Sequence, residues 1–441
     1  MATPDAQQLK GLEQLLAAAR YAEAESLARA LLVRFPEHGF AWSALGAALL
    51  RTGRAAQALE PMRIAASLAP HDARPHHALG NALRSLGHLD EAVASQARAV
   101  QIQPSHAKAW FGLANAQRDL GRLDEAVAAY RRSLAEDPNL AKACLNLGNA
   151  LQELGRFAEA QQSYRRALGI QPDWPAALFN LHSALLCTDE PVAAIACLHQ
   201  AVSLNPGDPT FRFFLGVLLD HIGQPGAAEP HWRMLESGPA VGRARLDAWR
   251  YLKSSARAAA PRLLASSVQT FQLAVHAAAR EGLVLEFGVR HGKSIRQIAA
   301  MVGQPVHGFD SFAGLPEAWH REPKGSYSTQ GRIPNVPENV SLHVGWFDHT
   351  LPRFLIEHPG GVRLLNIDCD IYSSTKTVLD LLAPRIMPGS VIVFDEYIGN
   401  EFWRQDEFKA FQEAVDEHGW QYEYLGYSFA TKQVVVRILA T

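Results

Sequence analysis

The chain has 441 residues, of which 48% are hydrophobic and 20% charged, and its net charge at neutral pH is -2. This composition is typical of a globular chain with substantial cores, and the length predicts about two or three domains. The near-neutral balance, without a basic run, argues against a nucleic-acid partner. No basic start is followed by an apolar stretch, and no apolar run is long enough to span a membrane.

The four cysteines include no CxxC pair and stand at Cys144, Cys187, Cys197 and Cys369. Disulfide frameworks and zinc sites usually use closely spaced cysteines. We therefore expect reduced, partly buried thiols. Together with the lack of a signal peptide, this predicts a cytoplasmic protein.

The first half of the chain repeats with a step of 34 residues. Prolines recur at this step, at Pro36, Pro70, Pro104, Pro138, Pro172 and Pro206. Glycines recur in the same register at Gly53, Gly87, Gly121, Gly155 and Gly223, with Asp189 in the missing place. The proline cannot continue a helix, and the glycine closes one cheaply in a left-handed turn. A 34-residue helix–turn–helix unit is the tetratricopeptide repeat.

Small residues form two further ladders with the same step. One runs through Gly46, Gly80, Ala114, Gly148, His182 and Gly216, and the other is an alanine ladder from Ala24 to Ala228. Small side chains let the two helices of a unit approach closely, and His182 is a drifted member of the first ladder. We count about seven units over residues 3–240. In the first unit, only the second helix has a clear sequence pattern. The sequence thus predicts an α superhelical solenoid.

The concave face of such a solenoid is expected to bind a protein or peptide partner. Asparagines recur there in phase, at Asn81, Asn115, Asn149 and, in a second phase, Asn146 and Asn180. Side-chain amides can hydrogen-bond an extended peptide backbone. The pattern resembles the asparagine ladders of O-linked N-acetylglucosamine transferases. The alternative is that these are ordinary polar helix positions near the groove.

After the repeats, the pattern changes twice. A short arginine-rich helix is expected in a linker at residues 241–262. Over residues 263–441, strands alternate with helices, which predicts a doubly wound, largely parallel α/β sheet. The last two strands read as an antiparallel pair. This pair distinguishes the seven-stranded methyltransferase sheet from the plain dinucleotide fold.

The turn after the first of these strands carries the residues Glu286, Gly288, Gly292 and Ser294. Its two glycines let the backbone turn tightly and approach a ligand. The turn lacks the second glycine of the GxGxxG phosphate cradle. The E-x-G-x-x-x-G spacing is instead the methyltransferase form, which accommodates the methionine part of S-adenosylmethionine. We therefore expect these four residues to contribute to cofactor binding.

Further cofactor contacts are expected at the ends of the next two strands. Asp310 ends the second strand, and a carboxylate about 20 residues after the glycine turn accepts hydrogen bonds from ribose hydroxyls. Ser311 stands beside it. The alternative for Asp310 is a cap for a following helix. Trp346 and Phe347 come after the third strand and are candidates to wall the adenine, with plain core packing as the alternative.

Acidic residues follow the fourth and fifth strands, with Asp368 and Asp370 after one and Asp395 and Glu396 after the other. Neighbouring parallel strands bring these carboxylates together, where they repel one another unless a cation or protons relieve them. Oxygen ligands suit magnesium, calcium or manganese, and such an ion would acidify an acceptor hydroxyl. The alternative is that one or two of the acids, Asp370 above all, cap helices.

The chain from Glu286 onward resembles the macrocin O-methyltransferase family, which modifies sugar hydroxyls in macrolide antibiotics. The resemblance rests on DSFAGLPEAW at 310–319, GWFDHTLP at 345–352, NIDCDIYSSTKTVLDLL at 366–382 and PGSVIVFDEY at 388–397. It implies S-adenosylmethionine as cofactor and a divalent ion, usually magnesium.

By position, Asp368, Asp395 and Glu396 match the metal-binding acids of that family, although the family often has two aspartates where this chain has Asp395-Glu396. The step from Asp368 to Asp395 is also similar to that of catechol O-methyltransferases. The insert at 320–339 resembles the variable substrate lid. His320 is its leading candidate for a catalytic base, beside Asp368.

These observations leave three functions open. The first is a metal-assisted O-methyltransferase that acts on a sugar or glycan-like hydroxyl while the repeats recruit a partner or the substrate. The second is an interaction scaffold whose methyltransferase domain binds the cofactor without catalysis. The third is a protein methyltransferase. The retention of Glu286, Gly288, Gly292, Asp310 and Asp368 favours an active enzyme, because a decayed domain would tend to lose them.

Overall fold

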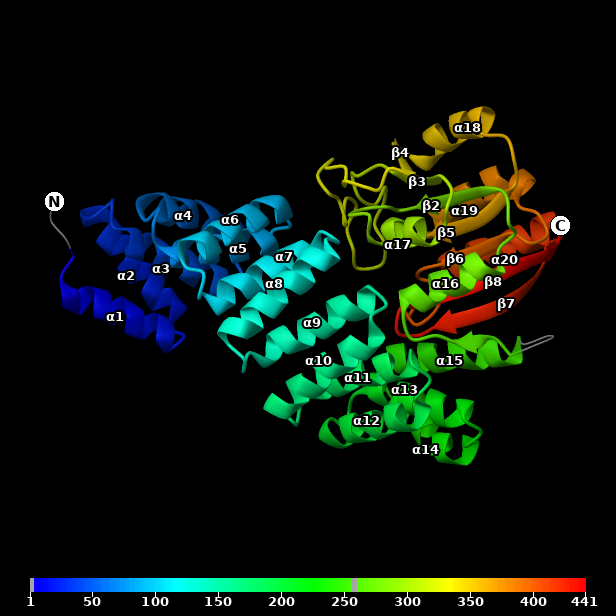
Figure 1. Ribbon diagram of the computed structural model, residues 1–441, viewed down its shortest axis with the longest axis horizontal. Helices are drawn as coiled ribbons and strands as arrows, with labels where there is room; N and C mark the ends of the chain where they lie inside the picture. The colour runs from blue at the N-terminus through cyan, green and yellow to red at the C-terminus, as the bar shows by residue number, and fades with distance from the viewer. Residues whose placement is uncertain (1–3, 256–259) are drawn as a thin grey trace. The chain divides into compact units, whose positions relative to one another are not determined.

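The computed structural model describes residues 4–255 and 260–441, and the chain divides into two compact units, residues 1–150 and 151–441 (Figure 1). The described residues of the first unit form helices only. The second unit contains further helices and one mixed sheet. A helical array is therefore followed by an α/β region, as the sequence predicts.

The helices of the first unit associate in consecutive pairs. They are α1 (Ala6–Ala17), α2 (Tyr21–Arg34), α3 (Gly39–Arg51), α4 (Ala55–Leu68), α5 (Ala73–Ser85), α6 (Leu89–Ile102), α7 (Ala107–Asp119), α8 (Leu123–Glu136) and α9 (Ala141–Glu153), the last of which crosses the unit boundary. Gly53, Gly87 and Gly121 close the turns inside the pairs with φ of 73–79°. Ala19 takes the same left-handed conformation between α1 and α2, with φ of 56°.

The small-residue ladder marks the closest approach inside each pair. A Cβ added at Gly46 would lie 2.5 Å from Cγ of Met62, and one added at Gly80 would lie 2.7 Å from the Gln96 side chain. The facing side chain therefore occupies the space that glycine leaves. This confirms the packing role that the ladder predicts.

The second unit begins with further helices of the same kind. They are α10 (Phe157–Ile170), α11 (Pro175–Leu186), α12 (Pro191–Leu204), α13 (Pro209–His221) and α14 (Pro225–Glu236). Asp189 replaces the ladder glycine and still adopts φ of 61°, so the turn keeps its geometry without glycine. His182, at a small-residue position, is buried, and its ring bonds the Phe179 carbonyl. Helices α11 and α12 contact each other, as do α13 and α14, so the pairing of consecutive helices continues in this unit.

A fifteenth helix, α15 (Ala240–Ser254), occupies the segment where the sequence predicts a linker helix. It packs on α13 and α14. The Trp249 indole N–H donates to the Asp220 carboxylate over 3.2 Å, and Lys253 forms an ion pair with the same carboxylate at 2.7 Å. The helix therefore covers the last repeat.

The remaining elements form the α/β region. Its strands are β1 (Arg262–Leu263), β2 (Leu283–Phe287), β3 (Val306–Asp310), β4 (Val340–Val344), β5 (Val362–Ile367), β6 (Val391–Phe394), β7 (Gln421–Ser428) and β8 (Gln433–Ala440). Its helices are α16 (Ser267–Ala277), α17 (Lys293–Met301), α18 (Phe347–Glu357), α19 (Tyr372–Leu382), η1 (Ala383–Arg385) and α20 (Glu407–His418).

The strands are ordered β1-β7-β8-β6-β5-β2-β3-β4. Strands β2 to β6 pair in parallel, whereas β8 pairs antiparallel with both β6 and β7. Helices α16 and α17 pack together, and α18, α19 and α20 contact one another in sequence (Figure 1). The strand order reverses between β2 and β5, so their carboxyl ends form the crevice where open α/β sheets bind ligands.

Two features differ from the sequence prediction of a seven-stranded sheet. The described sheet has eight strands, because the two-residue β1 adds to β7 in parallel at the edge. The sequence analysis also assigned no helix directly after the third predicted strand, whereas α18 begins at Phe347, directly after Trp346. Both elements are too short or too close to a strand to be seen in hydrophobic periodicity.

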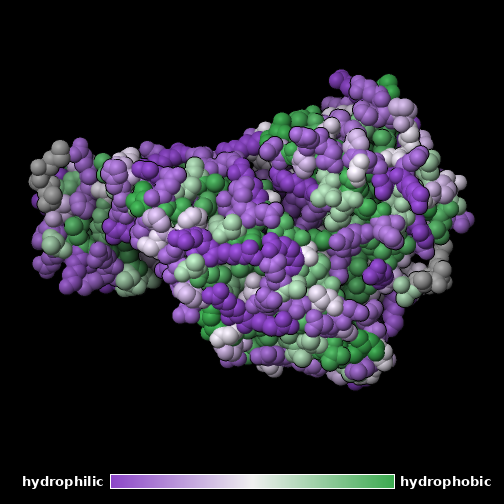
Figure 2. All heavy atoms as spheres, viewed as in Figure 1, coloured by the Kyte–Doolittle hydropathy of each residue, from purple (hydrophilic) through white to green (hydrophobic). Residues whose placement is uncertain are grey.

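The visible surface is mostly polar, with scattered apolar residues, over both units (Figure 2). The apolar residues of the α/β region collect inside instead, in a cluster between the sheet and α16–α17 that includes Phe271, Val284, Ile295 and Val391. Within residues 4–255 and 260–441, no helix is both long and apolar enough to cross a membrane.

Candidate functional site

A cavity of about 760 Å³ lies at the carboxyl ends of β2, β3, β5 and β6. Of the sequence-predicted residues, it is lined by Gly288, Asp310, Ser311, Trp346, Phe347, Asp368, Asp395 and Glu396. Glu286, Gly292, Ser294 and His320 are not part of the lining. With Asp370, which also lines it, the cavity brings together nine of the residues named in the sequence analysis, and four lie outside the lining.

Gly288 is where two strand ends come closest. It has φ of 94°, and its N–H donates to the Phe309 carbonyl over 3.0 Å. A Cβ at this position would lie 1.7 Å from the backbone carbonyl oxygen of Asp368. Only glycine fits between the ends of β2 and β5, so the cavity floor is bare backbone.

Glu286 and Ser294 support this turn from behind. The fully buried Glu286 carboxyl accepts hydrogen bonds from the Ser294 hydroxyl at 2.9 Å and from the Asn366 amide at 3.1 Å. Burial raises the pKa of Glu286 to about 8. Gly292 caps α17 with φ of 73°. These three residues shape the turn, and their direct contact with a cofactor stays a prediction.

Asp310 ties the end of β3 to the glycine turn. Its Oδ2 accepts the backbone N–H groups of Val289 at 2.9 Å and Arg290 at 2.7 Å, and its Oδ1 accepts that of Phe312 at 2.6 Å. The segment after Asp310 contains no helix, so the carboxylate caps none. One lone-pair direction of Oδ1 stays available for a hydroxyl donor, as an oxygen accepts two hydrogen bonds.

Aromatic rings form one wall of the cavity. The Phe347 ring meets that of Phe287 edge-on at 5.2 Å, and Trp346 is partly exposed just before α18. On the side of the 320–339 insert, Tyr327 lines the cavity, and the Arg290 guanidinium lies 5.2 Å from the centre of its ring. Flat apolar walls of this kind suit a base or a sugar ring.

The acids at the strand ends raise one another's pKa. Burial and the neighbouring carboxylates Asp395 and Asp370 raise the pKa of Asp368 well above its usual range. Burial and Glu396 raise the pKa of Asp370 to about 7 and that of Asp395 to about 6. No described residue donates a hydrogen bond to the Asp368 carboxylate. The cluster therefore favours protons or a cation at neutral pH.

Lys432 supplies a cation that the sequence analysis missed. Its ammonium lies 2.7 and 2.9 Å from the two oxygens of Glu396 and lines the cavity. Beside it, the Gln433 amide donates to Oδ1 of Asp395 over 2.6 Å. Register explains both contacts, because β8 runs antiparallel to β6 with Phe394 opposite Val434. Residues 432 and 396 therefore face each other beyond the strand ends.

Glu407 is a second residue that the sequence analysis missed. It is fully buried at the start of α20, and its Oε2 accepts the backbone N–H of Glu396 at 3.0 Å. Its Oε1 is buried without a hydrogen-bond partner. Burial, with Asp395 next in effect, raises the pKa of this carboxyl well above its usual range. Its hydrogen bond with the Glu396 backbone joins the start of α20 to the loop after β6.

His320 lies outside the cavity lining. Its Nε2 is 2.8 Å from Oδ2 of Asp406, and its ring stacks on Phe402 at 4.1 Å. This contact joins the insert to the loop before α20. Its role as a catalytic base stays a prediction.

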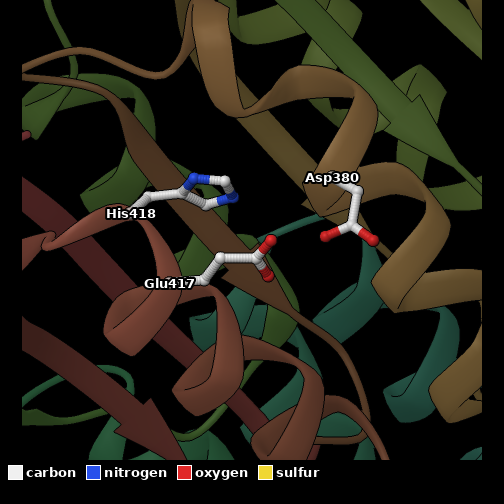
Figure 3. A group of neighbouring side chains, drawn as sticks. All are labelled: Asp380, Glu417 and His418. Atoms are coloured by element: carbon white, nitrogen blue, oxygen red, sulfur yellow. The ribbon is translucent and has the colours of Figure 1, made fainter.

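A separate group of ligand-type side chains lies at the ends of α19 and α20, where the ring of His418 lies above the carboxylate of Glu417 and both face Asp380 (Figure 3). One potential ligand atom from each residue lies within 4.8 Å of the others. The Lys376 ammonium already pairs with both carboxylates, at 3.0 Å from Glu417. These acids therefore have their counter-ion.

In the repeats, the predicted asparagine ladder is partly engaged internally. The buried Asn115 accepts hydrogen bonds from the Tyr130 hydroxyl at 2.6 Å and the Asn146 amide at 2.8 Å. Asn81 accepts one from Gln96 at 3.0 Å and contacts His77. These amides link neighbouring helices, and binding of a peptide by the ladder stays a prediction.

Different parts of the chain match different known families. Residues 285–397 match a family described as a methyltransferase domain. Residues 13–73 and 77–141 match one tetratricopeptide repeat family, and residues 117–185 match another.

A curated relative matches part of the second half. It is the 8-demethyl-8-(2,3-dimethoxy-alpha-L-rhamnosyl)-tetracenomycin-C 4'-O-methyltransferase of Streptomyces olivaceus, 29% identical over 118 residues. The match covers 24% of this chain and 44% of the relative, so the chain spans less than half of that protein's length.

Two solved structures overlap with part of the chain. The Cut9–Hcn1 hetero-tetramer of the APC/C is 19% identical, covers 50% of this chain and 44% of that one, and gives a TM-score of 0.42. PilF of Pseudomonas aeruginosa is 18% identical, covers 45% of this chain and 90% of that one, and gives a TM-score of 0.41.

Proposed function

The chain carries tetratricopeptide repeats and a methyltransferase domain, and from this premise we propose that it transfers the methyl group of S-adenosylmethionine to a hydroxyl acceptor in the cavity above β2, β3 and β5. The single observation that carries the proposal is the coincidence of a bare glycine floor, a ribose-type acid and a group of high-pKa carboxylates in one cavity.

The residues of the cavity fit the methyl donor. Gly288 contributes to the cavity lining, and its lack of a Cβ allows the ends of β2 and β5 to approach each other there. Asp310 has remaining acceptor capacity for a ribose hydroxyl, and Trp346 and Phe347 offer apolar surface for adenine. When bound, S-adenosylmethionine supplies an electrophilic methyl group on a sulfonium.

Transfer forms an oxygen–carbon bond as the sulfur–carbon bond breaks, and the acceptor hydroxyl gives up its proton. Asp368 lines the cavity, and burial beside Asp395 and Asp370 raises the pKa of its carboxyl well above its usual range, which makes it a better proton acceptor. The cavity walls would position an acceptor hydroxyl against the methyl donor, which would contribute to rate. We therefore assign Asp368 as the acceptor of the proton.

The proposal also includes a divalent cation at the acidic cluster. The acids Asp368, Asp395 and Glu396 offer the hard oxygen ligands that magnesium prefers, and burial, followed by the neighbouring carboxylates, raises the pKa of the first two. Glu396 would exchange Lys432 for the ion. When bound, such an ion lowers the pKa of an acceptor hydroxyl.

The acceptor class and the role of the repeats complete the proposal. The relative from Streptomyces olivaceus is named for methylation of a 4' oxygen on a rhamnosyl-bearing compound, which favours a sugar or glycan-like hydroxyl here. The repeats would recruit a protein partner or the carrier of this acceptor, because stacked repeats provide an extended concave surface.

The test is methyl transfer from S-adenosylmethionine labelled in its methyl group into cell-extract glycan and protein fractions. We expect label in the glycan fraction with the wild-type chain. Asp368→Asn should nearly abolish transfer, whereas Asp380→Asn, the same change on α19 outside the cavity, should not. Label in proteins alone would favour a protein methyltransferase, and equal transfer by both variants would refute the assignment of Asp368.

A further inference from the structure

Both members of the Glu396–Lys432 ion pair belong to irregular segments at the cavity rim. Glu396 stands in the loop of residues 395–406, between β6 and α20, and Lys432 stands in the turn of residues 429–432, between β7 and β8. The two segments are also joined through the backbone, since the Ile398 N–H donates to the Lys432 carbonyl over 3.3 Å. Neither segment contains a helix or strand of its own.

The loop is held from outside by α15. The Asp247 carboxylate makes two hydrogen bonds with the Arg404 guanidinium, at 2.8 and 3.0 Å. The Arg245 guanidinium donates to the Gly399 carbonyl over 3.3 Å and to the Thr210 hydroxyl of α13 over 3.0 Å. Two side chains of α15 thus contact the loop that carries Glu396.

The turn is held by the same helix and by the last repeat. The Phe429 ring lies 4.7 Å from that of the fully buried Phe213 on α13 and 6.4 Å from that of Trp249 on α15. Lys432 follows three residues later. The two partners of the ion pair are therefore anchored to the same pair of helices, at contacts far apart in sequence.

We propose that α15 is a positioning element of the active site, in which Arg245 and Asp247 hold the 395–406 loop so that Glu396 stays at the cavity. In this role α15 positions a loop of the active site and does not only connect the repeats to the α/β region. The proposal goes beyond the proposed function and relies on it only for the catalytic readout.

The pair of Asp247 and Arg404 is the best place to test this. Its side chains are 50% and 46% exposed, so its loss should leave folding nearly unchanged. The chain offers a matched control in Glu236 and Arg250, which form an ion pair at 2.6 Å with side chains 49% and 57% exposed. That pair joins α14 to α15 and does not reach the 395–406 loop.

The experiment compares full-length Asp247→Asn and Glu236→Gln. In transfer of labelled methyl into the glycan fraction, Asp247→Asn should lower the maximal rate by about 2- to 30-fold, in the range for substitutions that act through a contact network. Its KM for S-adenosylmethionine and its melting temperature should match those of Glu236→Gln. Asp247→Glu should restore most of the lost rate, because the longer carboxylate can still pair with Arg404.

Hydrogen–deuterium exchange of the same proteins gives a readout that needs no acceptor. Peptides covering residues 396–406 should exchange faster in Asp247→Asn than in Glu236→Gln. Equal rates and equal exchange in the two variants would overturn the proposal. If the wild-type chain transfers no methyl at all, the proposed function fails, and unchanged exchange in 396–406 would then overturn the positioning role on its own.

Discussion

Substitution of Gly288 by alanine tests the glycine floor of the cavity directly. The added Cβ would lie 1.7 Å from the Asp368 carbonyl oxygen and 2.6 Å from its carbonyl carbon, and φ at this position is 94°. Left-handed backbone costs a residue with a Cβ about 1–2 kcal/mol, and overpacking typically adds about 1–3 kcal/mol. We therefore expect Gly288→Ala to lower the free energy of unfolding by about 2–5 kcal/mol.

Two other glycines separate these contributions. Gly292 has φ of 73° but no atom closer than 3.4 Å to an added Cβ, and Gly303 has neither positive φ nor a neighbour within 4 Å. Gly292→Ala should then lose only the backbone part, about 1–2 kcal/mol, and Gly303→Ala close to nothing. Urea unfolding followed by tryptophan fluorescence measures all three. Equal stability of the Gly288 and Gly292 variants would refute the overlap with the Asp368 backbone.

Three further outcomes are expected. Burial lowers the pKa of His182 to about 4, so protonation of this histidine favours the unfolded chain. The free energy of unfolding should therefore fall as the pH drops below about 6.5 and level off near pH 4. Between pH 7 and pH 5, urea unfolding should show a loss up to about 2 kcal/mol larger for the wild-type chain than for His182→Gln, and parallel losses would contradict this. Residues 1–150 form a compact unit and should give a helical circular dichroism spectrum as an isolated fragment; a random-coil spectrum would count against this unit. Asp395→Asn should weaken magnesium binding in calorimetry without changing affinity for S-adenosylmethionine, and magnesium binding equal to that of the wild-type chain would rule out Asp395 as a ligand.

The fold was largely predictable because short-range sequence patterns specify most of its helices and strands. The proline and glycine ladders fix the helix ends of each repeat, and the left-handed φ of Gly53, Gly87 and Gly121 is the physical basis of the ladder. The alternation of strands and helices predicts the doubly wound sheet. The eighth strand was not predictable, since two residues at a sheet edge leave no periodic signal.

The site was predictable only where a residue follows its own strand. Asp310, Asp368 and Asp395 were found because parallel strand ends meet at one edge of the sheet. Lys432 was not, because its contact with Glu396 depends on the antiparallel register of β8 against β6. The same holds for Asp247, whose partner Arg404 lies 157 residues away.

The central claim, that S-adenosylmethionine binds at the glycine turn with its ribose on Asp310, is tested most directly by calorimetric titration of the cofactor into the wild-type chain and Asp310→Ala. Removal of a hydrogen bond to a charged group costs about 1.5–3 kcal/mol, so the dissociation constant should rise by about 10- to 150-fold. The control is Asp380→Ala on α19, outside the cavity, which should bind as the wild-type chain does. Binding to Asp310→Ala with unchanged affinity would contradict the account.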